Sequence, residues 1–404
     1  MDKQTKTLAA CLGGAAAMGP MAMDMYLPAM PTMGQDLGAL AGEIELSMVG
    51  FLIGFCLGQL LFGPISDATG RKPVMLVGVV LFVIASLGCL SATTIPQVIF
   101  WRVAQGIGGS VGMVMATASV RDLYTGHMAT RLVGLTMIVF GVAPVIAPVA
   151  GGLILNYFSW HAVFWLLAGY GVLMLGALIK FFPETRSVES RANSRPSKAL
   201  HTYWALTLDK DFIPYALANA LSQSSLFVYI AGASFVLIEI YGLTPLQFSF
   251  AFAGNALALV IGAQLGGPLG QRLGPRRISK IATGLRATVT VLLLGVFLAG
   301  FATLPAVLVL LLVSLLIYGL ALPTSGVLAL DKQAQNAGTA SALMGALGFG
   351  LGAIASGLLS TFSNGTALPL FALMAVTAVA AACVTWAFFD RWDQDAPVGA
   401  SIAR

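Results

Sequence analysis

Charged residues are scarce in this sequence. Only 9% of the 404 residues are Asp, Glu, Lys or Arg, whereas 58% are hydrophobic. A soluble globular domain carries roughly 25% charged residues, so this chain has too few charges to cover a water-facing surface. The composition excludes an ordinary soluble enzyme and favours a helical membrane protein, because a bilayer accepts an apolar exterior.

Cysteine and histidine are also rare. The four cysteines, at positions 11, 56, 89 and 383, lie in or near apolar stretches and lack metal-ligand spacing. We interpret them as small packing residues rather than a disulfide framework or a zinc site. The short loops contain no cluster of His, Ser or carboxylate residues and no Gly-rich phosphate loop. We therefore expect no enzyme activity, no cofactor and no ATP-driven pump.

Long apolar runs are what the sequence has instead. A helical span needs about 20 residues, and the chain has room for twelve, with short loops between them. The predicted spans are Leu8–Leu27, Leu46–Gly63, Val74–Ser91, Gln97–Ala118, Leu132–Leu153, Ala162–Phe181, Ile213–Ile238, Phe248–Leu269, Ile281–Phe301, Ala306–Leu328, Thr339–Leu359 and Ala367–Phe389. The pattern predicts an all-α membrane protein.

The cations fall on one side of these spans. If the N-terminus is cytoplasmic, twenty of the 21 Lys and Arg residues are inside and the outer loops hold none. This positive-inside pattern predicts cytoplasmic termini, and it explains the net charge of +5 without a nucleic-acid partner. The twenty are Lys3, Lys6, Arg71, Lys72, Arg121, Arg131, Lys180, Arg186, Arg191, Arg195, Lys198, Lys210, Arg272, Arg276, Arg277, Lys280, Arg286, Lys332, Arg391 and Arg404.

Few charges remain for the outer side and the membrane interior. Arg102 is the one cation that we place inside a span. We expect Asp36, Glu43 and Glu45 to be ordinary solvated charges of an outer loop, and we place Glu239 at a span end.

The sequence divides into two related halves. The polar stretch 183–211 separates residues 1–182 from residues 212–390, and residues 391–404 form a tail. At an offset of 204 residues, "GQLLFGPISDATGRKP" at the end of the second span matches "GAQLGGPLGQRLGPRR" at the end of the eighth. Four identical glycines and prolines carry the match, including the pairs Gly58 with Gly262 and Gly70 with Gly274. We expect two pseudo-symmetric six-helix bundles, a plan that transporters use, joined by a cytoplasmic linker.

Asp24 is the most informative residue, because we place it well inside the first span. An intramembrane carboxylate is costly and is a functional candidate by default. Burial disfavours its charged form, which would suit reversible protonation. Arg102 lies roughly 9 Å along the fourth span from its outer end, so the two side chains could share a depth. We expect Arg102 to hold Asp24 ionised until substrate intervenes; the alternative is a purely structural ion pair.

The segment "GPISDATGRKP", from Gly63 to Pro73, resembles the loop signature of the major facilitator superfamily. In that family the loop latches the cytoplasmic gate. The resemblance makes Asp67 the latch acid and either Arg121 or Arg131 its expected partner. We read the segment as a loop between spans two and three, with glycines that permit a tight turn. Its expected gating residues are Gly63, Asp67, Gly70, Arg71 and Lys72.

The fifth span, "GLTMIVFGVAPVIAPVAGG", resembles the antiporter motif of drug–proton exporters, whose glycines form a pliable hinge. Ala143 and Ala147 stand where glycine is usual, and a Pro-kinked packing helix is the alternative. The expected hinge residues are Gly134, Pro144, Pro148, Gly151 and Gly152.

Further stretches narrow the resemblance. "MDMYLP", "FWRVAQGIGGS", "RDLY" and "FPETR" look like the bicyclomycin and chloramphenicol resistance branch (Bcr/CflA) of drug–proton antiporters. That branch exports amphipathic antibiotics by exchange for protons from the bacterial inner membrane. Asp24 corresponds to its coupling acid. Ala16 occupies the position of a second acid found in some relatives, so we expect one proton per cycle.

The resemblance implies a monomeric antiporter that works by alternating access and whose partners are protons, membrane lipid and amphipathic small molecules. Proton-coupled uptake, export of a metabolite and a non-transporting membrane protein are the alternatives. Adaptable apolar side chains and amides are suited to a drug pocket. The candidate substrate-binding residues are Asp24, Tyr26, Met137, Phe140, Asn219, Gln223, Tyr229 and Asn255.

Overall fold

The computed structural model describes residues 3–124, 126–192, 196–331, 333 and 337–389, and these residues form helices and short connections. The helices are α1 (Lys3–Asp24), the 3₁₀ turn η1 (Leu27–Ala29), α2 (Met30–Asp36), α3 (Ala41–Thr69), α4 (Arg71–Leu90), α5 (Ile95–Leu123), α6 (Gly126–Leu155), α7 (His161–Phe181), α8 (Val188–Ala192), α9 (Pro196–Leu208), α10 (Ile213–Ser234), the π-helix η2 (Phe235–Ile240), α11 (Pro245–Leu273), α12 (Pro275–Leu298), α13 (Leu304–Leu330), α14 (Ala337–Phe362) and α15 (Leu368–Phe388).

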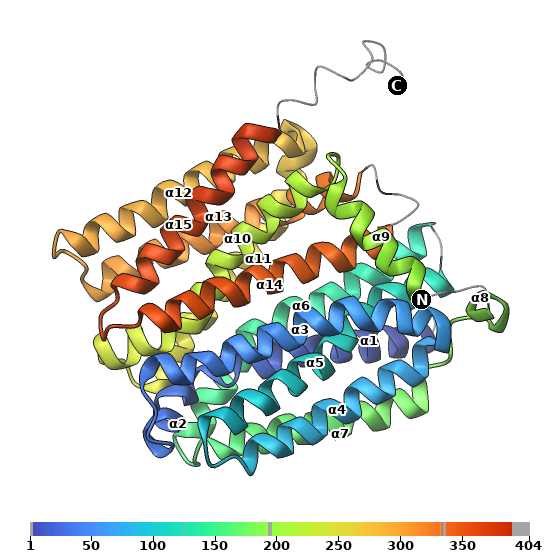
Figure 1. Ribbon diagram of the computed structural model, residues 1–404, viewed down its shortest axis with the longest axis horizontal. Coiled ribbons are helices and arrows are strands. Elements are labelled where there is room, and N and C mark those ends of the chain that lie inside the picture. The colour runs from blue at the N-terminus through green and yellow to red at the C-terminus, as the bar shows by residue number, and fades with distance from the viewer. Residues whose placement is uncertain (1–2, 125, 193–195, 332, 334–336, 390–404) are drawn as a thin grey trace.

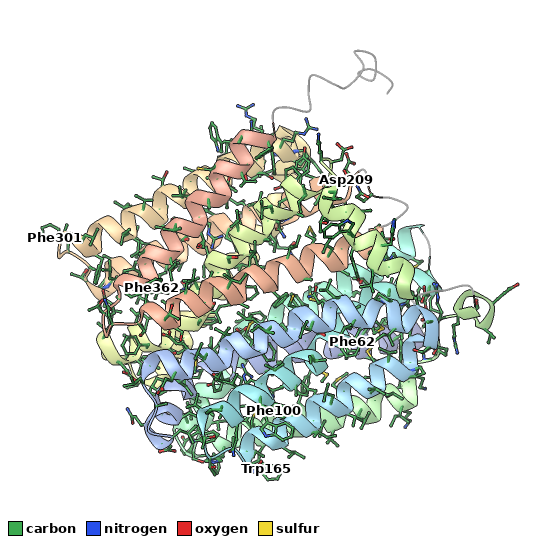
Figure 2. The ribbon with its side chains drawn as sticks, viewed as in Figure 1. Phe62, Phe100, Trp165, Asp209, Phe301 and Phe362 are labelled. Carbon is green, nitrogen blue, oxygen red and sulfur yellow. The ribbon has the colours of Figure 1, made fainter. Side chains whose placement is uncertain are left out.

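Twelve helical stretches in the described part of the chain are long and apolar enough to cross a membrane, as the sequence predicted. Most extend beyond the predicted limits; for example, α3 runs from Ala41 to Thr69, whereas the predicted span is Leu46–Gly63. Large apolar side chains cover the outside of the bundle. Trp165 and Phe301 are 63% and 74% exposed, and Figure 2 shows both at the periphery of the molecule. Side chains of this kind suit contact with lipid rather than water.

The helices form two bundles. Figure 1 shows α1–α7 in the lower half of the view and α10–α15 in the upper half. Helix α3 packs against α14, and α6 packs against α11, so these two contacts join the bundles. The N-terminal end of α1, the C-terminal end of α15 and helices α8 and α9 all lie toward one end of the molecule (Figure 1). We call this the linker end and the opposite end the outer end.

The paired glycines of the repeat occupy equivalent positions. Gly70, between α3 and α4, has φ 111°, and Gly274, between α11 and α12, has φ 87°. Both are in the left-handed half of backbone space, which glycine adopts without a steric cost. A Cβ on Gly58 would collide with Ser110 on α5, and a Cβ on Gly262 would collide with the Leu316 carbonyl on α13. Each bundle therefore uses the same close helix crossing.

The segment Gly63–Pro73 is not a loop, contrary to our expectation. Helix α3 continues to Thr69 and α4 starts at Arg71, so only Gly70 interrupts the two helices. Gly63 lies within α3, and a Cβ added to it would meet no atom within 4 Å. The turn depends on one glycine rather than two, because a single residue with positive φ is enough to reverse the chain here.

Two charge assignments were wrong. Arg286, which we placed in a cytoplasmic loop, lies within α12 and is 2% exposed. Glu45, which we read as a solvated loop charge, lies on α3 and is also 2% exposed. Residues Arg195, Lys332, Arg391 and Arg404 and the tail 391–404 lie outside the described residues, as do the side chains of Lys3 and Lys198.

Candidate functional site

A cavity of about 430 Å³ lies between the two bundles at the linker end. Its walls come from α3, α5 and the first residue of α4 in the first bundle and from α10, α13 and α14 of the second, and α9 contributes Ala199 and Tyr203. Asp67, Arg71 and Arg121 are the charged residues of its lining. The volume is within the range of sites for drug-sized ligands, roughly 300–1,000 Å³.

Side-chain amides line the inner walls of this cavity. Gln59 on α3 lies against Gly345 of α14, and Gln223 on α10 lies against Gly348 of the same helix. A Cβ at either glycine would collide with the glutamine amide oxygen, so the glycines provide the space for these side chains. Asn219 also lines the cavity, and its Oδ1 accepts a hydrogen bond of 3.1 Å from Ser325. Each of the three amides retains hydrogen-bonding groups that a bound molecule could use.

A row of aromatic rings lies between the cavity and the buried charged groups of the first bundle. Phe349 lines the cavity, and its ring centroid lies 4.3 Å from that of Phe55 and 4.9 Å from that of Phe227. Phe55 in turn lies 5.9 Å from Phe51, whose ring packs 4.5 Å from the Cζ atom of Arg102. The aromatic side chains therefore separate the amide-lined cavity from the buried charged groups.

Asp24 is one of these buried groups. It ends α1, where the helix stops before the η1 turn, and it is 2% exposed. Its Oδ1 atom is buried and has no hydrogen-bond partner among the described residues. Asp24 lies close enough to Tyr229 on α10 to interact with it electrostatically. The acid is therefore near the boundary between the bundles, without the ion pair that would stabilise a permanent charge.

The structure does not pair Arg102 with Asp24. Arg102 is fully buried, and its Nη1 atom donates to the Ala22 carbonyl at 3.0 Å and to Gln105 Oε1 at 2.6 Å. Its guanidinium also packs over the Tyr26 ring, 4.6 Å from the centroid. The Nε and Nη2 atoms have no partner in the described part of the chain. The expected ion pair is absent here because a backbone carbonyl, an amide and two aromatic rings surround the cation instead.

The candidate substrate residues separate into two groups. Asn219 and Gln223 line the cavity, whereas Tyr26, Phe140, Tyr229 and Asn255 do not. Two of the latter make polar pairs: Tyr26 with Ser47 at 2.7 Å, and Tyr229, which accepts from Asn255 Nδ2 at 2.7 Å.

Phe140 packs half-buried against the main core, and the side chain of Met137 lies outside the described residues. The prediction from sequence did not include Gln59 and Phe349, which line the cavity. An amide or a phenylalanine inside an apolar helix gives no sequence pattern that marks it as part of a binding site.

The acid of the predicted gating segment has a different partner from those expected. Asp67 Oδ1 lies 2.7 Å from Arg71 Nη2 and 3.8 Å from Arg186. Among the described residues, neither Arg121 nor Arg131 forms an ion pair with it. Asp67 and Arg71 stand four residues apart across the Gly70 turn, and this spacing brings the two side chains together. The acid is thus held within its own bundle.

Two further acids complete this network. Asp122, from "RDLY", accepts from Arg71 Nε at 2.9 Å, and Glu184, from "FPETR", accepts from the backbone N–H groups of Arg71, Lys72 and Arg186. Burial alone would raise the pKa of Glu184. The three N–H donors and the nearby Arg191 outweigh burial and hold that pKa below its usual value. Glu184 therefore caps the N-terminus of α4 as a carboxylate.

Helix α9 joins this end of the molecule to the cavity. Tyr203 donates a hydrogen bond of 3.3 Å to the Leu60 carbonyl on α3 and lines the cavity. Burial, with a smaller contribution from the Asp67 charge, raises the pKa of Tyr203 to about 12. The phenol of Tyr203 therefore stays protonated at neutral pH and remains a hydrogen-bond donor.

The predicted hinge helix is continuous. Pro144 and Pro148 lie inside α6, which runs unbroken from Gly126 to Leu155. Gly151 lies against the Met25 carbonyl, next to Asp24, and Gly152 lies against Ser249 of α11. A Cβ on Gly134 would meet nothing within 4 Å. Two of the motif glycines thus provide close contacts at the bundle boundary, whereas a hinge motion stays a prediction.

The fold and site together define a membrane transporter, and the chain belongs to the Major Facilitator Superfamily, whose family pattern matches residues 12–348. An uncharacterized MFS-type transporter, YdgK of Bacillus subtilis (strain 168), is 36% identical over 93% of this chain and 94% of its own length. The bicyclomycin resistance protein homolog of Haemophilus influenzae (strain ATCC 51907 / DSM 11121 / KW20 / Rd) is 28% identical over 94% of this chain and 95% of its own. A chloramphenicol resistance protein of Pseudomonas aeruginosa is 33% identical over 68% and 65% of the two chains.

Solved structures support the same fold. The chain superimposes on the D-xylose-proton symporter with a TM-score of 0.74 and 16% identity, covering 95% of this chain and 97% of that one. It matches a mutant form of the nucleoside transporter NupG with a TM-score of 0.76 and 14% identity, covering 96% and 100%. The twelve-helix, two-bundle fold that the sequence predicted is therefore confirmed.

Proposed function

We propose that this protein exports small amphipathic molecules in exchange for protons by alternating access, with Asp24 as the acid that takes up and releases the proton. The observation that carries the proposal is the environment of Asp24, which is 2% exposed and whose Oδ1 has no partner among the described residues. An ionised carboxylate in such a place costs several kcal/mol. Protonation removes that cost, and hydration restores the charge when the site opens.

The cavity supports a drug-sized substrate. It combines three amides with apolar and aromatic walls, and the charged residues in the described part of its lining are Asp67, Arg71 and Arg121. Such a surface binds by shape and by a few adaptable hydrogen bonds. Two relatives named for bicyclomycin and chloramphenicol resistance favour export over uptake. The cavity faces the linker end, which the cation pattern predicts to be cytoplasmic.

We further propose a monomer in the bacterial inner membrane with both termini cytoplasmic, built from the bundles 1–182 and 212–390 and the linker 183–211. Arg102 is proposed to act on Asp24 from a distance rather than as an ion-pair partner. Two of its guanidinium nitrogens, in the buried region between Ala22 and Phe51, have no partner among the described residues. These are available to Asp24 if α1 and α5 shift against each other within the first bundle.

The test is expression in a drug-sensitive bacterium that lacks its own pumps, with a panel of amphipathic antibiotics, followed by drug-driven proton release from proteoliposomes. We expect the wild-type protein to raise the tolerated concentration of at least one compound. Asp24→Asn should abolish both resistance and proton release, because an amide cannot exchange a proton at this position. Asp331→Asn, which changes an exposed acid at the end of α13, is the matched control and should behave as wild type.

Wild-type proton release from Asp24→Asn would refute the role of Asp24. Accumulation of a panel compound, instead of its loss from the cell, would indicate uptake and refute export.

A further inference from the structure

Glu45 lies at the outer end of the molecule, opposite the cavity. It extends from the first bundle into a pocket formed by the second. It belongs to α3 of the first bundle, but the small pocket around it is lined by the second bundle. Gly232 of α10, Phe235 of η2, Leu359 of α14 and Leu370 of α15 are among its neighbours. The side chain is 2% exposed, so it forms part of the contact that closes the outer end.

No described residue of this contact supplies a counter-charge to the carboxyl group. Its Oε2 atom is buried and accepts no hydrogen bond from the described residues. Among the described residues that line the pocket, those from the second bundle include no titratable group, and the side-chain hydroxyls are those of Ser363 and Thr366. On its own helix, the nearest acid is Glu43, which accepts from the Leu40 backbone N–H at 2.9 Å.

The outer ends of the bundles touch beside Glu45. Ser360 Oγ on α14 donates to the Gly42 carbonyl on α3 at 2.5 Å. A Cβ on Gly42 would come within 2.6 Å of the Ser360 carbonyl, so the backbones approach closely. The second bundle also carries a π-helical turn here, Phe235–Ile240, a wide turn that is frequent at functional sites. The contact that closes the outer end in this structure is therefore also the one that buries Glu45.

We propose that Glu45 is a second proton-binding site, and that a proton on its carboxylate is required for the outer ends of the bundles to close. An ionised carboxylate enclosed without a partner is unfavourable. When the outer ends separate, Glu45 meets external water and loses its proton to that water. When it takes the proton back, forming the neutral acid, the contact with α10, α14 and α15 closes.

This proton returns to the outer side and is not carried across, so Glu45 sets the balance between outward-open and outward-closed states without adding to the exchanged protons. The inference rests on alternating access, which is part of the proposed function. Because one proton is bound on closure, the ratio of closed to open molecules changes up to about tenfold per pH unit. Acid outside the cell favours closure.

The experiment is a distance measurement by electron spin resonance in lipid nanodiscs between pH 5 and pH 9. Spin labels are attached at Leu40→Cys and Phe362→Cys in a form whose four native cysteines are replaced by serine. Both positions are exposed, and they lie at the outer ends of the two bundles. We expect the wild-type distance distribution to lengthen as the pH rises. Glu45→Gln, which is neutral and similar in shape, should keep the short distance throughout.

Glu43→Gln is the control, because it removes a charge two residues away and keeps an oxygen to accept from Leu40 N–H. It should respond to pH as the wild type does. Retention of the full pH response by Glu45→Gln, or its absence from the wild type, would overturn the proposal. Thermal unfolding of Glu45→Gln at pH 5 checks that the variant folds, and its midpoint should lie near that of the wild type.

The same measurement in Asp24→Asn separates this proposal from the proposed function. A pH response that persists in Asp24→Asn and disappears in Glu45→Gln supports Glu45 even if no drug–proton exchange is found. Loss of the response in Asp24→Asn together with its persistence in Glu45→Gln would assign it to Asp24 and reject the role of Glu45.

Discussion

Two buried arginines show the same arrangement in the two bundles. Arg102 donates from Nη1 to the Ala22 carbonyl and packs over Tyr26, and Arg286 donates from Nη1 to the Ser222 carbonyl at 2.6 Å and packs over Tyr318 at 4.3 Å. In both, Nε and Nη2 have no partner among the described residues. A planar guanidinium can use a carbonyl and an aromatic face together. Each cation is therefore stabilised without a carboxylate.

At the scale of residues, the sequence predicted which charged residues lie inside the membrane better than it predicted which groups they contact. Asp24 and Arg102 were recognisable because charges are rare inside apolar runs. That they form no ion pair with each other could not be predicted, because an ion pair depends on rotamers and on the packing of Tyr26 and Phe51. Arg286 escaped notice because it follows a run of cations at 272–280 around the turn between α11 and α12, and sequence distance alone does not reveal burial. Glu45 was misread for the same reason at the start of α3.

Glu184 gives a prediction for the acid range. Its pKa is held below the usual 4.5 in the folded protein. A depressed pKa contributes stability above the unfolded value, and that stability is lost as the pH falls through the folded value. We therefore expect the thermal unfolding midpoint of the detergent-solubilised protein to decrease as the pH is lowered below about 4.5.

Glu184→Gln should lower the midpoint at pH 7 and make it less sensitive to pH in this range. Glu189→Gln, an exposed acid of α8, is the control. An unchanged slope in Glu184→Gln would contradict the capping role.

At the scale of helices, the Gly70 turn positions Asp67 and Arg71 on adjacent helix ends. Helix α3 ends where Gly70 takes φ 111°, and α4 starts at the next residue. The existence of these helices followed from long apolar runs, and all twelve spans were predicted. The ends were not, because helices in a transporter continue beyond the apolar core as amphipathic turns, and hydropathy alone does not detect those turns.

Gly70 and Gly63 should therefore respond differently to alanine. Gly70→Ala places a Cβ at positive φ and against Glu184 Oε2, so we expect it to cost about 1–3 kcal/mol. Gly63→Ala adds a methyl group that meets nothing within 4 Å, and alanine is the better helix former by about 1 kcal/mol. Thermal unfolding followed by tryptophan fluorescence should show a lower midpoint for Gly70→Ala and an unchanged or higher one for Gly63→Ala. Equal losses would favour a loop that contains both glycines.

At the scale of the whole molecule, the bundles touch at the outer end and leave a cavity at the linker end. The two-bundle plan was predictable from the offset of 204 residues and from the single polar stretch. The cavity was not, because its wall depends on how Gly345 and Gly348 of α14 meet Gln59 and Gln223. Such contacts between distant segments leave no local sequence pattern.

This asymmetry predicts from which side of the membrane a thiol reagent can reach a given position. In a form that lacks native cysteines, Ser341→Cys in the cavity should react with a water-soluble maleimide in inside-out vesicles and not in intact cells. Asn364→Cys, exposed at the outer end, should react in intact cells. The reverse pattern would overturn the cytoplasmic placement of the termini, and labelling of Ser341→Cys from both sides would indicate that the outer end opens readily.

The cavity wall and the buried acid share no residue: Gln59, Asn219 and Gln223 belong to the cavity, and Asp24 does not. Selection can therefore act on the two separately. On the proposed function, one amino-acid change at an amide position would alter which compounds are held and leave the proton-binding acid intact. If the proposed drug export holds, a bacterial population exposed to a new antibiotic would need one such change, rather than several coordinated ones, to shift the range of exported drugs.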